Sequence, residues 1–307
     1  MILCCGEALI DMLPRQSESG EAVFAPYPGG AVFNTSVALG RLGVPVGLLT
    51  GLSRDLFGQR LERSLQASHV GHDLAIRSDR PTTLAFVTLK DGQAQYAFYD
   101  ENTAGRMLAP EDMPGRLEGV SALFFGGISL AVEPCAEGYA ALCLREAATR
   151  PVMLDPNIRP GFIADEARYR ERLNGMLAVA DIVKLSDEDL VWLEGDGDLP
   201  DLAAKVLARG PKLLCLTEGA SGVTGYTGTG SVFVEAQKAQ VVDTVGAGDT
   251  FNAGFLASLH GGGVLTKAAL ADLSDGDLRD ALTLGARAAA ITVSRAGANP
   301  PWAAELQ

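Results

Sequence analysis

Four short apolar segments recur about every 30 residues in the middle of the chain, and their spacing constrains the fold more than any other feature. They lie at residues 123–125, 152–154, 182–185 and 213–216. Helical patterns separate some of them, which is typical of βαβ units. Strands covered by helices on both faces read as continuous apolar runs. We therefore predict an α/β protein with a mostly parallel sheet and helices on both faces.

Polar or small residues follow each of these predicted strands, at residues 126–127, 155–157, 186–189 and 217–219. In open α/β sheets, ligands bind in the crevice outside the carboxyl ends of the strands. The sequence therefore predicts a ligand site at that edge of the sheet.

Residues 241–251 are the most informative stretch for chemistry, because Gly246, Ala247 and Gly248 stand directly before a helical pattern. The first amides of a helix have no intrahelical partner, and the helix dipole favours negative charge there. This arrangement predicts an anion site. Asp249 follows this anion site directly. A carboxylate beside a bound phosphate would repel it, but it can take the proton from a hydroxyl that attacks the phosphoryl group. The alternative is that Asp249 only caps the helix.

The N-terminal part predicts further ligand contacts. Residues 2–13 are expected to form one buried strand, in which Asp11 is either a strand-end turn residue or a ligand contact, because a buried carboxylate is costly without a partner. Gly29 and Gly30 precede a helical pattern and either start the helix or let a ligand approach closely. Asn34, one turn into that helix, has a donor and an acceptor for a hydroxyl pair.

Two hairpin-like stretches stand apart from the βαβ pattern. One runs from Leu13 to Tyr27, and the other pairs residues 83–89 with 94–99 across the turn signal Lys90-Asp91-Gly92. We predict a small β-sheet, formed by about residues 13–28 and 82–105, that projects from a single α/β domain spanning 1–307. A plain surface sheet is the alternative interpretation.

Composition narrows the possible partners. A formal net charge of −13 argues against nucleic-acid binding and against a polybasic membrane contact. No apolar run is long enough to span a membrane. The five cysteines lie in apolar stretches without a CxxC pair, which favours reduced core thiols and a cytoplasmic protein.

The stretch Asp-Thr-Val-Gly-Ala-Gly-Asp-Thr-Phe at 243–251 resembles the C-terminal signature of the ribokinase-like (PfkB) carbohydrate kinases, and the resemblance covers essentially the whole chain. It implies a three-layer α/β/α fold with a small β-sheet lid over the sugar, which in many members also forms a homodimer. It also implies an ATP-dependent sugar kinase, with a fructokinase that makes fructose 6-phosphate as the best match. The last Asp of the motif, here Asp249, is implied to be the catalytic base, and the amides of Gly246, Ala247 and Gly248 the anion hole.

The same resemblance implies the remaining site residues. Sugar contacts are implied at Asp11, Gly29, Gly30 and Asn34. Arg159, within Asp155-Pro156-Asn157-Ile158-Arg159-Pro160, is expected to hold a phosphate or a substrate carboxylate, with a surface ion pair as the alternative. The positions implied to bind the nucleotide are Lys184, Ser186, Thr217, Gly219 and Gly222.

Two metals are implied as well. Mg²⁺ would be reached through water from Asp189, although this chain departs from the family's Asn-x-x-Glu segment with Ser186 and Asp189. A monovalent cation, K⁺, is implied between two loops. Its ligands would be Asp243 and the backbone carbonyls of Val245, Thr292, Arg295 and Gly297.

Other functions stay open at this point. The segment at 155–159 does not separate fructose from 2-keto-3-deoxygluconate, and ribose is a further candidate. A catalytically silent sugar-binding protein on the same fold is a different class. A dinucleotide-dependent oxidoreductase is disfavoured, because no strand is followed by GxGxxG with an acidic residue about 20 positions on.

Overall fold

The computed structural model describes residues 1–90 and 93–306, with only the backbone of 88–90 and 93–96; Asp91 and Gly92 of the predicted turn lie outside the described residues, as does Gln307. Within them, an eight-stranded main sheet has the order β14-β13-β12-β11-β10-β9-β1-β4. Its strands are β1 (Ile2–Cys5), β4 (Val46–Leu49), β9 (Ala122–Gly126), β10 (Val152–Asp155), β11 (Ile182–Ser186), β12 (Leu213–Thr217), β13 (Gly222–Thr227) and β14 (Ser231–Glu235).

The predicted mostly parallel sheet is confirmed. All pairs from β4 to β12 are parallel, and β13 and β14 are added antiparallel at one edge. The four apolar segments of the middle of the chain form the neighbouring strands β9, β10, β11 and β12. The chain leaves β1 toward β4 on one side and later returns to β9 on the other, so the sheet has a switch point beside β1, where ligands bind in such folds.

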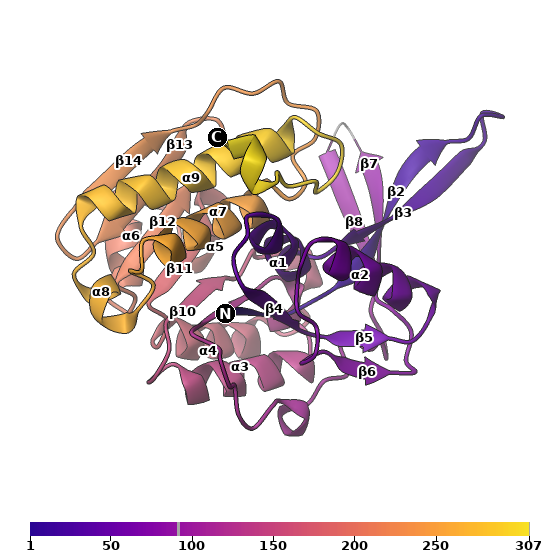
Figure 1. Ribbon diagram of the computed structural model, residues 1–307, viewed down its shortest axis with the longest axis horizontal. Coiled ribbons are helices and arrows are strands. Elements are labelled where there is room, and N and C mark those ends of the chain that lie inside the picture. The colour runs from indigo at the N-terminus through magenta and orange to yellow at the C-terminus, as the bar shows by residue number, and fades with distance from the viewer. Residues whose placement is uncertain (91–92, 307) are drawn as a thin grey trace.

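Helices cover both faces of the main sheet (Figure 1). One buried core contains side chains of α1 (Ala31–Arg41), α2 (Leu56–Ala67), α7 (Ala247–Gly261), α8 (Lys267–Ala271) and α9 (Asp275–Val293). The other contains side chains of α3 (Cys135–Glu146), α4 (Glu166–Leu177), α5 (Asp187–Glu194) and α6 (Leu199–Leu207). Short 3-10 turns occur at Pro110–Asp112, Ile128–Leu130, Pro160–Phe162 and Ala303–Leu306.

The prediction of one buried strand over residues 2–13 is wrong. The chain turns at Gly6-Glu7, and the apolar run is divided between β1 in the main sheet and β2 (Leu9–Gln16) in a second sheet. The reason is the carboxylate of Glu7, which accepts hydrogen bonds from two backbone amides outside the sheet and thereby holds the chain in a turn. Asp11 therefore lies on a strand of the small sheet.

The second sheet has the order β3-β2-β7-β8, with β3 at Ala22–Gly29, β7 at Leu84–Lys90 and β8 at Gln93–Tyr99. It contains both predicted hairpins, and β2 joins them by pairing with β7 in parallel. The β2–β3 hairpin extends away from the body of the molecule (Figure 1). A further two-stranded sheet pairs β5 (Gly51–Ser53) with β6 (Ile76–Ser78).

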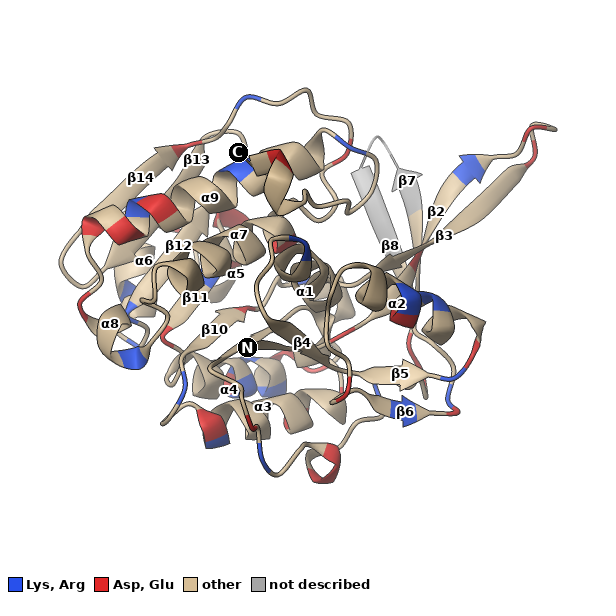
Figure 2. Cartoon of the chain, viewed as in Figure 1, with Lys and Arg blue, Asp and Glu red and all other residues tan. Residues whose placement is uncertain are grey.

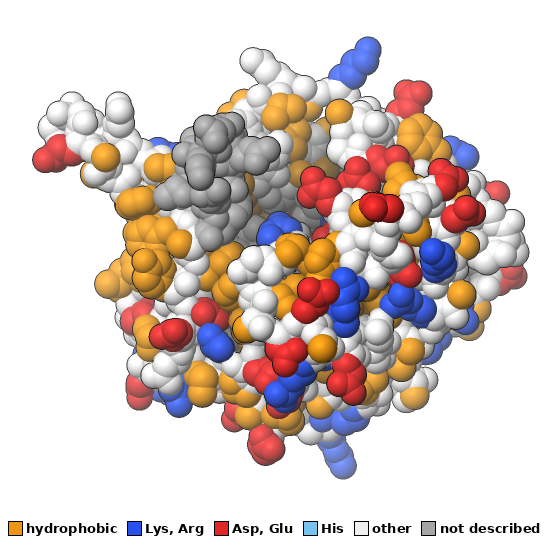
Figure 3. All heavy atoms as spheres, turned by 180° about the vertical axis from the view of Figure 1, so that it is seen from behind, with side chains coloured by type: hydrophobic (Ala, Val, Ile, Leu, Met, Phe, Trp, Pro, Cys, Tyr) orange, Lys and Arg blue, Asp and Glu red, His pale blue; other side chains and the backbone are white. Residues whose placement is uncertain are grey.

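The Lys, Arg, Asp and Glu residues lie mainly on the outer helices and loops (Figure 2). On the face seen from behind, acidic and basic side chains are interspersed (Figure 3). Among the helices of the described residues, none combines the length and the apolar character that crossing a membrane requires.

Candidate active site

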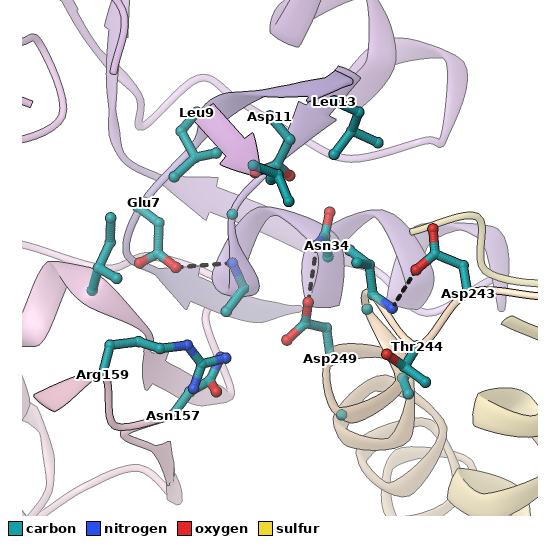
Figure 4. Close-up of a pocket in the computed structure, with 18 of the residues that line it drawn as sticks. Glu7, Leu9, Asp11, Leu13, Asn34, Asn157, Arg159, Asp243, Thr244 and Asp249 are labelled. Atoms are coloured by element: carbon teal, nitrogen blue, oxygen red, sulfur yellow. Dashed lines mark hydrogen bonds between the residues drawn. The ribbon is translucent and has the colours of Figure 1, made fainter. Parts of the chain in front are cut away.

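A cavity of about 680 Å³ opens at the carboxyl ends of the main-sheet strands. Its lining comes from β2, from the N-termini of α1 and α7, and from the segments that follow β9 and β10. These parts are far apart in the sequence and face one another across the cavity (Figure 4). The predicted site residues that line it are Asp11, Gly30, Asn34, Arg159, Lys184, Asp243, Val245, Gly246, Ala247, Gly248 and Asp249.

The N-terminus of α7 presents free backbone amides to the cavity. Gly246 precedes the helix in the left-handed conformation with φ of 78°, and a Cβ there would lie 2.6 Å from Cβ of Ala298. The amide of Ala247 donates to the carbonyl of Thr244 over 3.3 Å. The amides of Gly248 and Asp249 donate to no acceptor within the described residues. Two free amides at the positive end of a helix form a site for an anion.

Asp249 lies beside these amides and is 8% exposed. Its Oδ2 accepts a hydrogen bond of 2.9 Å from Nδ2 of Asn34, one turn into α1 (Figure 4). Its backbone carbonyl accepts a hydrogen bond from the hydroxyl of Thr35. Burial raises the pKa of Asp249 to about 7, and the Asn34 hydrogen bond opposes that rise. Its carboxylate accepts no amide of its own helix, so the structure does not support the capping alternative. A carboxylate with this pKa is well placed to accept a proton near neutral pH.

Asp11 points into the cavity from β2, opposite Asp249 (Figure 4). Its side chain has no hydrogen-bond partner among the described residues, and burial, together with the charge of Glu7, raises its pKa to about 7. Gly29 lies next to it on β3, where any Cβ would collide with the Asp11 carboxylate. Gly29 is outside the cavity lining, and its structural effect is to leave room for Asp11.

Glu7 also lines the cavity, although no role was predicted for it. Its carboxylate accepts hydrogen bonds from the amide of Ala31 over 2.9 Å and from that of Ser129 over 3.3 Å. Gly30 has a φ of 105°, and a Cβ built on it would lie 3.0 Å from both Cγ and the backbone carbonyl oxygen of Glu7. Glu7 thus fixes the start of α1 against the cavity. The signal was an acidic residue inside an apolar run, which Asp11 also shows.

A buried polar cluster lies behind the anion site. Nζ of Lys184, on β11, is 3.3 Å from Oδ2 of Asp155 at the end of β10. The same oxygen accepts a hydrogen bond of 2.7 Å from Nδ2 of Asn252 on α7. Burial lowers the pKa of Lys184, but the carboxylates of Asp155 and Asp189 outweigh this effect and raise it. Asp155 belongs to a segment that the sequence places at the ligand edge of the sheet, but neither it nor Asn252 is assigned a role by the sequence.

Arg159 lies at the cavity on the side away from Asp243 (Figure 4). It is exposed, and its Nη1 donates to the carbonyl of Ile158 over 3.1 Å. It forms no ion pair within the described residues, so the predicted alternative of a surface ion pair is not observed.

The remaining predicted nucleotide positions lie outside the cavity lining. Ser186 caps α5, and both oxygens of Asp189 accept backbone amides, those of Ile158 over 2.9 Å and of Ser186 over 3.1 Å. Ser186 and Asp189, which replace the Asn and Glu of the family's Asn-x-x-Glu segment, therefore form a capping box. Thr217 ends β12, Gly219 lies in the turn that follows it, and Gly222 begins β13.

The two loops to which a monovalent cation was assigned lie side by side. Oδ1 of Asp243 accepts the amide of Val245 over 3.0 Å, and its Oδ2 accepts the amide of Gly297 over 2.9 Å. The amide of Asp243 donates to the carbonyl of Val293. Asp243 thus connects the loop that contains Val245 with the loop that contains Arg295 and Gly297, while the fourth predicted carbonyl ligand, Thr292, lies in the last turn of α9. Within the described residues, no cluster of three or more His, Cys, Asp or Glu side chains is arranged to hold a metal ion.

Comparisons with known proteins show the family to which the chain belongs. The sequence profile described as "pfkB family carbohydrate kinase" matches residues 1–305. A fructokinase from Rhizobium leguminosarum bv. trifolii is 54% identical over 280 residues, which are 91% of this chain and 86% of that protein. A fructokinase from Salmonella typhimurium is 34% identical over 265 residues, 85% of each chain. The crystal structure of a fructokinase with bound ATP from Xylella fastidiosa superposes with a TM-score of 0.88 at 32% identity, covering 97% of this chain and 93% of that one.

Proposed function

The chain belongs to the pfkB family of carbohydrate kinases, and we propose that it is an ATP-dependent fructokinase that converts D-fructose to fructose 6-phosphate. The observation that carries the activity is the position of Asp249, a buried carboxylate beside free helix amides in a cavity. The choice of fructose is supported by the Rhizobium leguminosarum fructokinase, which is 54% identical to this chain over 280 residues.

The reaction uses Asp249 as the general base. The C6 hydroxyl oxygen of the sugar attacks the γ-phosphorus of ATP and forms the new O–P bond, while the bond from that phosphorus to the β–γ bridging oxygen breaks. The electron pair leaves with ADP, and the hydroxyl proton moves to Asp249. The unpaired amides of Gly248 and Asp249 stabilise the charge on the phosphoryl oxygens, since they are oriented before the reaction begins. Gly246 and Ala247 shape this turn.

The residues on the opposite side of the cavity from Asp249 bind the sugar. Asp11 accepts hydrogen bonds from sugar hydroxyls, which supply the partners that its carboxylate lacks in the cavity. Asn34 holds the Asp249 carboxylate and can contact the same hydroxyl. Gly29 and Gly30 allow Asp11 and Glu7 to reach the site. The small sheet is the lid, and it excludes water that would compete with the sugar as acceptor.

We expect ATP and metal ions to bind at the cavity and at the segments beside it. The free amides and the ammonium of Lys184 suit a polyphosphate. The nucleoside of ATP would lie toward Ser186, Thr217, Gly219 and Gly222, at the ends of the neighbouring strands. Mg²⁺ would neutralise phosphate charge, and Asp189, whose two carboxylate oxygens already accept backbone amides, would reach it only through the waters that Mg²⁺ keeps. K⁺ would be held beside Asp243 by the carbonyls of Val245, of Thr292 in the last turn of α9, and of Arg295 and Gly297 in the loop that follows.

We further propose that the whole chain acts as one kinase domain, that it forms a homodimer through the small sheet, and that it works in the cytoplasm. The dimer is supported by exposed apolar side chains on that sheet, namely Val23, Phe24, Tyr27 and Tyr99. The cytoplasm is supported by five buried cysteines, all of them free thiols.

A second candidate substrate is a sugar acid such as 2-keto-3-deoxygluconate. The observation that favours it is Arg159, whose guanidinium lies at the cavity without an ion-pair partner among the described residues and could hold a carboxylate in a fork.

The identity of the product tests the proposal. The protein is incubated with ATP, Mg²⁺, K⁺ and D-fructose, and the product is analysed by NMR. We expect a phosphate on O6 and one ADP for each sugar converted. A phosphate on O1, or ADP release that does not depend on fructose, would contradict it.

A further inference from the structure

The polar cluster formed by Lys184, Asp155 and Asn252 lies behind the anion site, and the capture of ATP by helix amides does not require it. All three residues are buried, with exposed fractions of 5%, 2% and 0%. Placing an ion pair in the interior is expensive, because desolvation of both charges can exceed their attraction. A purely structural cluster would have no reason to reach the cavity, yet Lys184 lines it.

The ammonium of Lys184 has unused donors that face the anion site. An ammonium has three N–H groups, and Asp155 is its one acceptor among the described residues. A Cβ built on Gly248 would lie 3.2 Å from Nζ. Lys184 therefore lies against the first turn of α7, where the amides of Gly248 and Asp249 are also free.

Two positive groups oppose each other here, since a lysine ammonium faces the positive end of a helix. This arrangement is unfavourable unless an anion binds between them. The anion must also lie next to Asp249, which is on the same turn and whose pKa is lowered by the charge of Lys184 against the effect of burial. The phosphate next to the proton acceptor is the one that is being transferred.

We propose that Lys184 is a catalytic residue that contacts the transferring phosphoryl group, and that Asp155 and Asn252 are positioning residues that hold it there. The inference rests on the proposed kinase reaction. Asp155 anchors Nζ and balances its charge, and Asn252, which bonds the same carboxylate oxygen, fixes Asp155 to α7. The cluster thereby joins β10, β11 and α7 at the point of transfer. The charge of Lys184 stabilises the phosphoryl oxygens and the lysine keeps its proton throughout.

Lys184→Met removes the ammonium with little change in shape, and Lys267→Met is its matched control. Lys267 also pairs with a buried carboxylate, Asp181, with Nζ to Oδ2 of 2.7 Å, but neither residue lines the cavity. We expect Lys184→Met to lower kcat about 10²-fold or more, the effect of removing one oxyanion donor, while KM for fructose is unchanged. Lys267→Met lowers the melting temperature and leaves kcat as it was. Equal kcat values for Lys184→Met and wild type would overturn the proposal.

Affinity measurements distinguish a contact of Lys184 with the transferred group from a contact with the rest of the nucleotide. Affinity is measured for ADP alone and for ADP with tetrafluoroaluminate and fructose, in which the fluoroaluminate takes the place of the phosphoryl group. Lys184→Met is expected to lose at least about tenfold in affinity for the second complex, because the missing cation acts on the transition state, and nothing for ADP. An equal loss for both ligands would overturn the proposal, since Lys184 would then bind ADP phosphates.

Asp155→Asn tests the positioning role through pH. The groups that face Lys184 are the carboxylates of Asp155, Asp189 and Asp249 and the thiol of Cys215. Without the Asp155 charge, burial lowers the pKa of Lys184. We therefore expect kcat of this variant to fall at a lower alkaline pH than kcat of the wild type. A loss of rate that is uniform across pH would indicate only altered packing and contradict the role.

Lys184→Met leaves the Asp155 carboxylate buried without its partner and can weaken the fold. The double variant Lys184→Met/Asp155→Asn has no unpaired charge in the cluster, and we expect it to melt near the wild type and to remain slow. A double variant with wild-type kcat would overturn the proposal.

The experiments on Lys184 do not depend on the identity of the sugar, because they use whichever acceptor the wild type phosphorylates. A wild type that phosphorylates no acceptor would contradict the proposed function instead.

Discussion

Asp249 is the residue on which the proposed chemistry depends, and its environment sets the pH range of activity. Burial raises its pKa to about 7, and the Asn34 hydrogen bond lowers it. Only the ionised carboxylate can accept a proton, so kcat/KM for fructose should fall as pH drops below about 7. In Asn34→Ala the lowering effect is gone, and the acidic fall should begin at higher pH. If kcat/KM of this variant falls at the same acidic pH as that of the wild type, the assignment of Asp249 is contradicted.

The base role itself is tested by Asp249→Asn. The amide cannot take the hydroxyl proton, so kcat should fall at least about 10²-fold, the lower range for loss of a general base. KM for fructose should change little. Asp165→Asn is the control for a helix-starting Asp, because Asp165 only caps α4 by accepting the amide of Arg168. It should retain wild-type kcat, and near-normal turnover in Asp249→Asn would remove Asp249 from the base role.

At the scale of elements, the start of α7 depends on Gly246. Alanine at φ of 78° is strained by about 1 kcal/mol or more, and here its Cβ would also meet Ala298 at 2.6 Å. We expect Gly246→Ala to lower both the melting temperature and kcat, because the amides of the first turn are displaced. Gly43→Ala is the matched control: its φ is 79°, and no atom lies within 4 Å of the added Cβ. It should lose only stability, and equal kcat losses in both variants would contradict this account.

The elements also mark the limit of what the sequence predicts. The middle strands and the start of α7 could be predicted because their sequence signals, the apolar runs and Gly-Ala-Gly-Asp, lie within the elements themselves. The division of residues 2–13 between two sheets was missed, since an apolar run does not reveal which strand it pairs with. The contact between Asp155 and Asn252 was missed for a similar reason, because their hydrogen bond joins positions 97 residues apart. Glu7 was within reach, as a carboxylate in an apolar run that needed a partner.

At the scale of the whole molecule, the small sheet is the proposed dimer interface. Its aromatic side chains cluster, with ring centroids 5.0 Å apart for Phe24 and Phe86, and Phe24 is 42% exposed. Exposed apolar clusters on a projecting sheet favour association. We expect sedimentation to give a dimer, and Phe24→Glu to give a monomer. Phe233→Glu is the control on β14, where the side chain is 47% exposed outside that sheet; it should stay dimeric. A monomeric wild type would contradict the interface.

The central claim is that this chain transfers phosphate from ATP to fructose. The most direct test is the rate of ADP release with ATP, Mg²⁺ and K⁺ against fructose, ribose, 2-keto-3-deoxygluconate, adenosine and no sugar. We predict that kcat/KM for fructose exceeds that for every other acceptor. Preference for 2-keto-3-deoxygluconate would contradict the choice of substrate and assign Arg159 to its carboxylate. No acceptor-dependent release with any of them would contradict the kinase itself.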